Sequence, residues 1–256
     1  MGGVGGVDLV TLARLGIGRF HIADPDVFAI ANVNRQYGAM RSTLGRLKVE
    51  VMAGIVRDIN PEAEVRVFRE AITPNNASAF LDGVDVFVDG IDAFEIDARR
   101  LLFRVAQSKG IFGLGAGPVG FSTVWVIFHP KGLSFDEYFD IHDGMDPVEK
   151  FAAYVVGMAP RATQRQYMDL AYLDFQQRCG PSTALACHLA GGVVGAEVLK
   201  ILLRRGPLSA APFFHQFDAY LGRFIRKRLW WGNRHPLQRL KRRCLVNFLR
   251  RKSLHT

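Results

Sequence analysis

The chain has 256 residues, of which 49% are hydrophobic and 22% are charged. This balance excludes wholesale disorder and supplies enough apolar side chains for one sizeable core. The formal net charge of +9 suggests a nucleic-acid or membrane binder, but the charge is segregated. Residues 223–256 hold 12 of the 33 Lys and Arg residues and no Asp or Glu, so the rest of the chain has 21 basic and 24 acidic residues. The body is therefore mildly acidic, at net −3, and the positive excess lies entirely in the last 34 residues.

The first half of the chain alternates between helical and extended patterns. Apolar residues spaced three to four apart predict helices over residues 7–15, 43–59 and 93–108. Alternating or continuous apolar runs predict strands over residues 19–23, 64–68, 84–88, 111–114 and 120–128. This alternation predicts an α/β protein with a Rossmann-like, mostly parallel sheet and helices on both faces.

The second half departs from this pattern. Residues 129–181 are predicted to form an irregular segment that covers the core, with helices over 147–156 and around 164–175. A helix over 183–203 and a strand over 213–217 follow. We therefore divide the chain into a core, a covering segment, a closing helix and strand of the same domain, and a basic amphipathic tail: 1–128, 129–181, 182–222 and 223–256.

Cysteine content and the longest apolar segment bear on the cellular compartment. The chain has three cysteines, Cys179, Cys187 and Cys244. No two of them form a C-x-x-C pair, which excludes a four-thiolate zinc site within one chain. So few cysteines, and the lack of a visible secretory signal, predict a cytoplasmic protein. The apolar segment 183–203 contains His188, Glu197 and Lys200, so we interpret it as a buried helix rather than a membrane span.

The chain opens on a glycine-rich turn, GGVGG at residues 2–6, that leads directly into a helix. Glycines at a strand-to-helix turn let the backbone approach a pyrophosphate, whose charge the helix N-terminus favours. The same turns also serve packing alone. A Rossmann-type turn follows a central strand, and here only Met1 precedes the glycines. We therefore expect that this sequence lacks the first strand of its fold and is truncated.

Polar residues suited to nucleotide binding follow the predicted strands. Asp24 ends the second strand, where an acid can accept hydrogen bonds from ribose hydroxyls. Arg35 and Lys48 can neutralise phosphates, and Asp92 is placed to hold Mg²⁺ together with phosphate oxygens. Each has an ordinary alternative, because lone Arg and Lys residues are commonly solvated and an Asp after a strand can simply cap the next helix.

Four segments together resemble the ThiF/MoeB/HesA family, the bacterial relatives of ubiquitin-activating enzymes. They read GGVGG, LARLGIGRFHIADPDVFAIANVNRQ, LGRLKVEVMAGIVRDINPEAEV and VFVDGIDAFEIDAR. The resemblance covers residues 1–128 and resumes more loosely over GGVVGAEVLKILL at residues 191–203. It implies that residues 1–128 are a nucleotide-binding adenylation core. The implied reaction is ATP-dependent adenylylation of a carboxylate, often the C-terminal Gly-Gly of a ubiquitin-like sulfur-carrier protein.

The resemblance also implies roles for individual residues. Gly3 would line the phosphate turn and Asp24 would bind the ribose. Phosphate contacts would come from Asn32, Arg35 and Lys48, and Asp92 would coordinate Mg²⁺; the three implied catalytic residues are Arg35, Lys48 and Asp92. The family usually forms homodimers. The family's zinc-binding cysteine pairs are absent here, and Cys179 lies where some relatives place a reactive cysteine, with an ordinary thiol as the alternative.

The motifs GIG, NVNRQ and TPNN most resemble one branch of the family, tRNA threonylcarbamoyladenosine dehydratase. This resemblance implies tRNA as an alternative substrate. Residues 129–181 match no branch. Two other classes stay open: a dinucleotide oxidoreductase, which would leave Lys48 and Asp92 without a role, and a non-catalytic scaffold with a degenerate adenylation fold.

The tail contains HPLQRLKRRCLVNFLRRK at residues 235–252, with apolar residues on one side of a predicted helix and arginines on the other. A basic amphipathic helix can lie on an anionic membrane or bind RNA phosphates. Trp230 and Trp231, just upstream, suit either interface. The alternative is a helix packed on its own domain with a solvated basic face.

Overall fold

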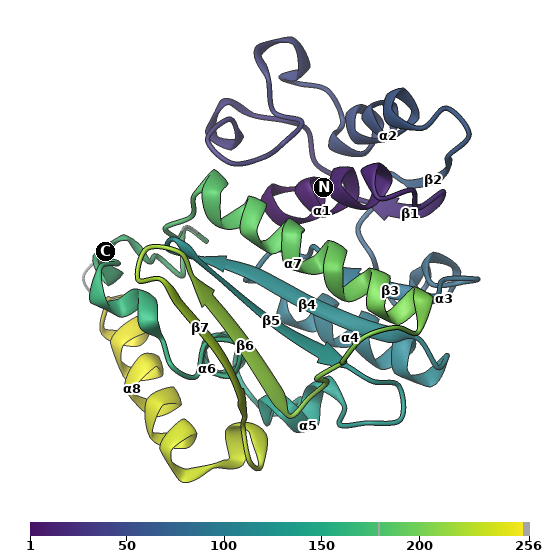
Figure 1. Cartoon of the computed structure of the whole chain (residues 1–256). Helices are drawn as coiled ribbons and strands as arrows, with labels where there is room; N and C mark the ends of the chain where they lie inside the picture. Colours follow the sequence, from purple (N-terminus) through teal and green to yellow (C-terminus); the bar gives the residue numbers. More distant parts are fainter. Residues whose placement is uncertain (179, 253–256) are drawn as a thin grey trace.

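The computed structural model of the protein describes residues 1–178 and 180–252. Its strands form two separate sheets (Figure 1). The smaller sheet pairs β1 (Arg19–Ala23) with β2 (Glu64–Phe68) in parallel, at the residues predicted for these strands. The larger sheet has the order β3-β4-β5-β6-β7. Its strands are β3 (Val86–Asp89), β4 (Phe112–Val119), β5 (Ser122–Phe128), β6 (Phe213–Asp218) and β7 (Arg223–Arg228).

Parallel pairing is confined to the strands β1 to β4. β3 and β4 run in parallel, with Asp89 opposite Gly115, whereas β5, β6 and β7 each pair antiparallel to the preceding strand. A two-residue turn links β4 to β5, and its Gly120 has a φ of 62°, which favours glycine at a tight hairpin. The predicted α/β, Rossmann-like class is confirmed, and the antiparallel half is a feature that the sequence patterns did not indicate.

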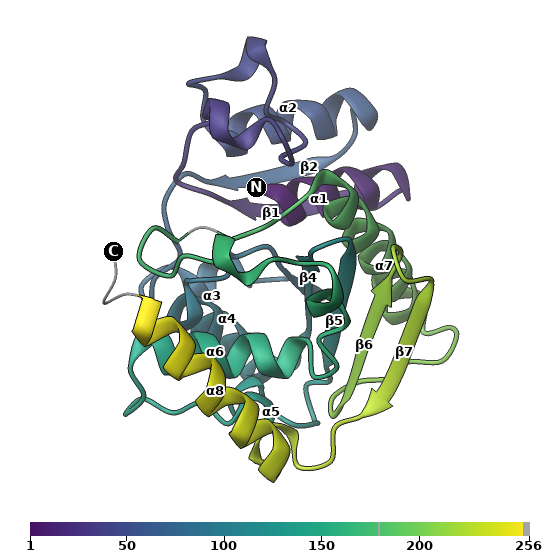
Figure 2. The same ribbon diagram turned by 90° about the vertical axis from the view of Figure 1, so that its left-hand side faces the viewer.

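Helices cover both faces of the larger sheet, as predicted (Figures 1 and 2). One face carries α7 (Ala184–Leu203) and part of α1 (Gly3–Arg14). The other face carries α4 (Ile96–Ser108), α5 (Phe135–Phe139) and α6 (Pro147–Met158). The smaller sheet packs against α2 (Lys48–Ile59), and the remaining helices are α3 (Ala77–Phe80) and α8 (Pro236–Lys252), which lies along α6.

Several predicted boundaries differ from the structure for local reasons. The predicted helix over 43–59 begins only at Lys48, because Gly45 has a φ of 79° that interrupts helical geometry after the 3-10 turn Arg41–Thr43. In contrast, α1 begins four residues before its predicted start, because the glycines themselves form its first turn. Short 3-10 turns also occur at Ile30–Asn32 and Gly232–Arg234.

The prediction of a helix around residues 164–175 is wrong. This region contains only the 3-10 turns Thr163–Gln166 and Leu170–Tyr172. Two buried polar side chains at its start bind a neighbouring strand instead of facing solvent: Thr163 Oγ1 donates to Asp218 Oδ2 at 2.6 Å. Gln216 Nε2 donates to Gln164 Oε1 at 3.0 Å. These bonds to β6 hold the segment in an irregular path over the sheet.

The expected tail is also partly a strand. Arg223–Arg228 form β7, which extends the sheet beyond β6, and only the later residues form the predicted amphipathic helix α8. One helix, α7, is long and apolar enough to cross a membrane by length and composition. It is buried against the sheet along one side, where Trp125 Nε1 donates to the buried Glu197 carboxylate at 3.3 Å.

Candidate nucleotide site

The glycine turn forms the bare N-terminus of α1. Gly2 caps the helix, and the backbones of Gly5 and Gly90 touch: a Cβ atom on Gly90 would lie 3.0 Å from Gly5 Cα. A Cβ atom on Gly3 would lie 3.0 Å from the Sγ atom of Cys187 on α7. The first turn of an α-helix leaves its N–H groups without intrahelical partners. Glycines therefore let β3, α1 and α7 converge around a helix end that favours anions.

Asp24 and Lys48 lie beside this helix end. Asp24 follows directly after β1, where its Oδ1 accepts a hydrogen bond from the Asp26 amide at 2.9 Å and its Oδ2 pairs with the Met1 amino group at 2.6 Å. Lys48 opens α2 with a buried side chain whose Nζ donates to Asp26 Oδ2 at 3.0 Å. The Asp26 side chain is 66% exposed. The buried lysine is thus paired with a solvated carboxylate, a partner that a phosphate could replace.

Arg35 reaches the glycine turn, whereas Asn32 shapes the loop that carries it. Asn32 Oδ1 accepts from the Ala29 amide at 3.0 Å and closes a 3-10 turn. Arg35 Nη1 donates to the Ala31 carbonyl at 3.0 Å, and the Arg35 Cγ would lie 3.5 Å from a Cβ atom on Gly3. The stem of Arg35 therefore crosses the N-terminus of α1. Asn32 already uses its side-chain oxygen within the loop.

Asp92 lies in the loop that follows β3 and is connected to the glycine turn through the nearby Gly90. Its Oδ1 accepts from the Phe94 amide at 2.8 Å within this loop, and it does not cap α4, whose N-cap is Glu95. Arg178, from the covering segment, lies 3.8 Å from the Asp92 carboxylate and donates to Glu95 at 2.6 Å. Asp92 remains 58% exposed. Within the described residues no contact joins it to Asp24 or Lys48, and no group of three potential metal ligands forms.

A buried charge pair supports the loop beneath Asp92. Arg99 Nε donates to Asp89 Oδ2 at 2.5 Å, and its two terminal nitrogens donate to the carbonyls of Ile91 and Asp92. The guanidinium also lies 4.3 Å from the centre of the Tyr154 ring. Sequence reasoning missed Arg99 and Arg178. An arginine ten residues after the strand-ending Asp89 was a weak signal for Arg99, whereas nothing near Arg178 pointed to Asp92.

A buried cysteine and an exposed histidine of α7 lie near the turn. Burial raises the pKa of Cys187 to about 11, so its thiol stays protonated near neutral pH. His188 is exposed and its ring lies 6.5 Å from that of Tyr37. Cys179, the other candidate nucleophile, lies outside the described residues.

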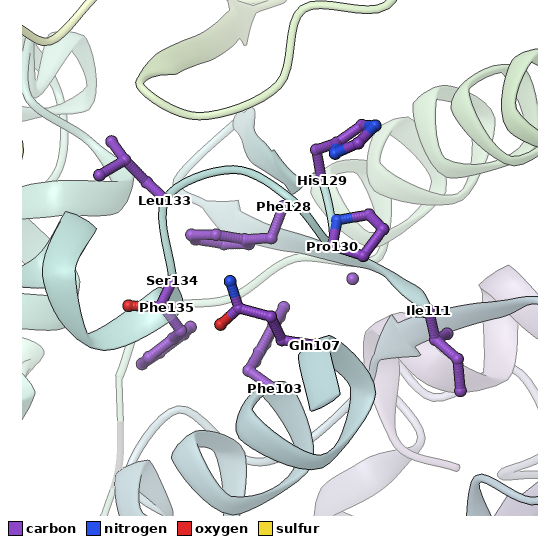
Figure 3. Close-up of a pocket in the computed structure, with 10 residues that line it drawn as sticks. Phe103, Gln107, Ile111, Phe128, His129, Pro130, Leu133, Ser134 and Phe135 are labelled. Carbon is purple, nitrogen blue, oxygen red and sulfur yellow. The ribbon is translucent and has the colours of Figure 1, made fainter. Parts of the chain in front are cut away.

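Figure 3 shows the residues around a small pocket of about 10 Å³ at the end of β4 away from the glycine turn, lined by Phe103, Gln107, Phe128 and Phe135 among others. It has room for about one water molecule. None of the charged residues around the glycine turn is among the residues that line this cavity.

Sequence and structure comparisons identify the family and the fold of the chain. The ThiF family profile matches residues 1–240. The tRNA threonylcarbamoyladenosine dehydratase of Haemophilus influenzae is 40% identical over 116 residues, which cover 45% of this chain and 44% of that protein. The SAMP-activating enzyme E1 of Haloferax volcanii is 33% identical over 110 residues, covering 43% of this chain and 40% of that enzyme. The matches thus span less than half of the length of these relatives.

Two solved structures share the fold over most of the chain. E. coli MccB, solved with MccA-N7isoASN, superposes with a TM-score of 0.66 at 17% identity and covers 89% of this chain and 62% of its own. PaaA superposes with a TM-score of 0.65 at 18% identity, and the match covers 89% of this chain and 61% of the PaaA chain. With its family profile matched over nearly the whole length and its glycine turn set at the strand ends, the chain belongs to the ThiF family.

Proposed function

We propose that the protein is an ATP-dependent adenylyltransferase that activates a carboxylate as an acyl-adenylate. The observation that carries this proposal is the bare helix end at Gly3, crossed by the Arg35 stem and flanked by Lys48, whose ammonium pairs with the exposed Asp26 carboxylate. Backbone N–H groups and two cations around one point suit a chain of phosphates. Membership of the ThiF family supports the same chemistry.

Each residue of the site has a distinct role in this proposal. The α1 N-terminus and Arg35 bind the phosphates, and Lys48 exchanges Asp26 for a phosphate oxygen. Asp24 accepts hydrogen bonds from the ribose hydroxyls. The single exposed carboxylate of Asp92 fits Mg²⁺, which is held by one or two carboxylates with phosphate oxygens supplying further ligands. The ion would add positive charge opposite the reacting phosphates, and Arg178 would turn from Asp92 toward Glu95.

The proposed reaction requires no proton transfer to or from the protein. An oxygen of the substrate carboxylate forms a bond to the α-phosphorus of ATP, and the bond to the bridging oxygen breaks, so that pyrophosphate leaves with its electron pair. The attacking carboxylate is already ionised, so no general base is needed. Rate enhancement comes from positioning and from neutralising the charge on the phosphates, for which Arg35 and Lys48 are the catalytic residues.

ATP–pyrophosphate exchange on the full chain tests the proposal. Exchange should depend on the carboxylate substrate. Lys48→Met should lower the rate of exchange at least about 100-fold, because a phosphate of ATP loses the lysine ammonium that neutralises it. Lys109→Met, an exposed lysine beyond α4, is the matched control and should retain the wild-type rate. Equal rates for the two variants would refute the assigned site, and the lack of ATP binding by the wild-type chain would favour the non-catalytic scaffold.

The identity of the carboxylate is a second question. The 40% identity to a tRNA threonylcarbamoyladenosine dehydratase favours a threonyl carboxylate on tRNA, followed by cyclisation, as an alternative to the C-terminus of a ubiquitin-like sulfur carrier. That identity lies within less than half of the chain. Separate exchange reactions with tRNA and with carrier proteins ending in Gly-Gly distinguish the two, since only the true substrate should support exchange.

We also propose that the enzyme is a homodimer that pairs through α7. Leu185, Gly192, Ala196 and Leu203 are exposed and form one stripe along the helix, because they are spaced seven, four and seven residues apart. Small residues in the middle of the stripe permit close approach of a second helix. A monomer in sedimentation equilibrium would contradict this assembly.

A further inference from the structure

The helix α8 has apolar residues on two opposite sides. One side is buried: Val246 and Leu249 pack on the body, and Gln238 Nε2 donates to the Val156 carbonyl at 3.1 Å. The opposite side is exposed and carries a stripe spaced three, four and four residues apart, which places its members on one face of the helix. This exposed stripe consists of Leu237, Leu240, Cys244 and Phe248.

The exposed stripe lies in a segment whose own charged residues are all basic. No Asp or Glu occurs from residue 223 to residue 256. Some arginines of α8 are neutralised by the body, as when Arg242 pairs with Asp140 at 3.2 Å. Arg243 and Arg251 are exposed and form no ion pair with any described carboxylate. A second copy of this face would bring like charges together, whereas an anionic surface complements it.

Two exposed tryptophans lie where α8 begins. Trp230 and Trp231 are 60% and 71% exposed. The Trp231 ring stacks on His235, one residue before α8, with centroids 6.0 Å apart, and Arg228 lies 4.1 Å from the centre of the Trp230 ring. Both views show α8 on the outside of the molecule, well away from the N-terminus of α1 (Figures 1 and 2). Indole rings favour the boundary between water and lipid.

We propose that the exposed stripe of α8, with Trp230 and Trp231, binds an anionic lipid surface. The helix then lies in the interface with Leu237, Leu240 and Phe248 among the acyl chains and with its arginines at the lipid phosphates. RNA would satisfy the arginines and the indoles, but it would leave the aliphatic leucines in water. A lipid surface satisfies all three kinds of residue at once.

Vesicle co-sedimentation of the full chain tests the proposal, with phosphatidylcholine alone and mixed with phosphatidylglycerol. The chain should bind the anionic vesicles and not the neutral ones. Leu240→Ser combined with Phe248→Ser should weaken partitioning at least about tenfold, because two apolar side chains no longer leave water. Arg243→Gln combined with Arg251→Gln should weaken it about fivefold for each arginine. Vesicles should also shift the emission of Trp230 and Trp231 to the blue, since Trp125 is already buried.

Matched variants at the other end of the molecule serve as controls. Ile30→Ser with Val33→Ser removes two exposed apolar side chains, and Arg14→Gln with Arg57→Gln removes two exposed charges. Both control pairs should bind like the wild type, and circular dichroism should show that every variant is folded. Binding of tRNA without binding of anionic vesicles would overturn the proposal, as would vesicle binding that the Leu240→Ser, Phe248→Ser pair leaves unchanged.

Discussion

Asp8 is the residue whose environment is least expected from its chemistry. It lies on α1 with 2% of its surface exposed, and neither carboxylate oxygen has a hydrogen-bond partner. Burial, together with the nearby charge of Asp89, raises the pKa of Asp8 well above its ordinary value. The native protein therefore binds a proton at Asp8 that the unfolded chain releases, and the free energy of unfolding falls as pH rises above the ordinary aspartate pKa.

Replacing this carboxyl should make the protein more stable at neutral pH. Asp8→Asn is expected to raise the free energy of unfolding by about 1 kcal/mol or more, because the isosteric amide carries no buried charge. The gain should grow with pH from the ordinary aspartate pKa up to the raised one and then level off. Urea unfolding at a series of pH values measures it, and Asp58→Asn, on the exposed side of α2, is the control. Equal stabilities of Asp8→Asn and wild type at every pH would contradict the assignment.

Some residues of the candidate site could be predicted from their positions in the sequence, and others could not. Asp24 and Asp92 follow predicted strands and Lys48 lies in a predicted helix, so the order of elements was enough to single them out. Arg178 lies more than eighty residues from Asp92, and its contact depends on the path of an irregular segment. Local patterns carry no information about such a pairing.

Helix α8 is fixed to the body by one buried amide rather than by its apolar residues alone. Asn233 Nδ2 donates to the carbonyl of Phe139, the last residue of α5, at 2.9 Å, and to the carbonyl of Ala153, within α6, at 2.7 Å. Its Oδ1 accepts from Gln238 on α8 at 3.3 Å. One side chain thus links α5, α6 and α8.

Loss of this amide should loosen α8 selectively. Asn233→Ala is expected to lower the free energy of unfolding by about 2 kcal/mol or more, because two buried carbonyls lose their donor. Limited trypsin digestion should then cut within α8, whose arginines become accessible, before the rest of the chain is cleaved. Asn247→Ala, at an exposed position on the same helix, should behave like the wild type. Equal digestion of the two variants would show that Asn233 does not hold the helix.

Elements with a strong period were predictable and elements held by long-range bonds were not. The amphipathic pattern located α8, and the alternation located β1 and β2 at their observed ends. Residues 164–175 carry a helical pattern, but bonds from Thr163 and Gln164 to β6 outweigh this local preference. β7 was missed because five of its six residues are exposed and half are arginines, as expected of an edge strand and not of a core strand.

At the scale of the whole molecule, the described residues form three hydrophobic cores, whereas the composition suggested one. The first lies between the larger sheet and α4 to α6, the second between the smaller sheet, α1 and α2, and the third beneath α7. Only α1 supplies fully buried residues to both the second and the third core: Leu9, Val10 and Ala13 to the second, and Leu12 to the third. The smaller sheet shares no strand pairing with the larger one.

The smaller sheet should therefore open more readily than the larger one. Amide hydrogen exchange is expected to be faster in β1 and β2 than in β4 and β5, because the two-stranded sheet has fewer buried residues and can separate as a unit. Adding ATP should slow exchange in β1 in particular, since Asp24 would then be held by the ligand. Uniform protection of the two sheets without ligand would indicate a single cooperative unit.

The remote placement of α8 gives the molecule an electric dipole. The body carries a net charge of −3 and the last 34 residues carry +12, and both views separate α8 from the N-terminus of α1. Near a negatively charged surface the basic end is attracted while the acidic body is repelled, so the field exerts a torque before any contact forms. The molecule would arrive already turned, with its glycine turn directed toward solution, where a diffusing substrate can reach it.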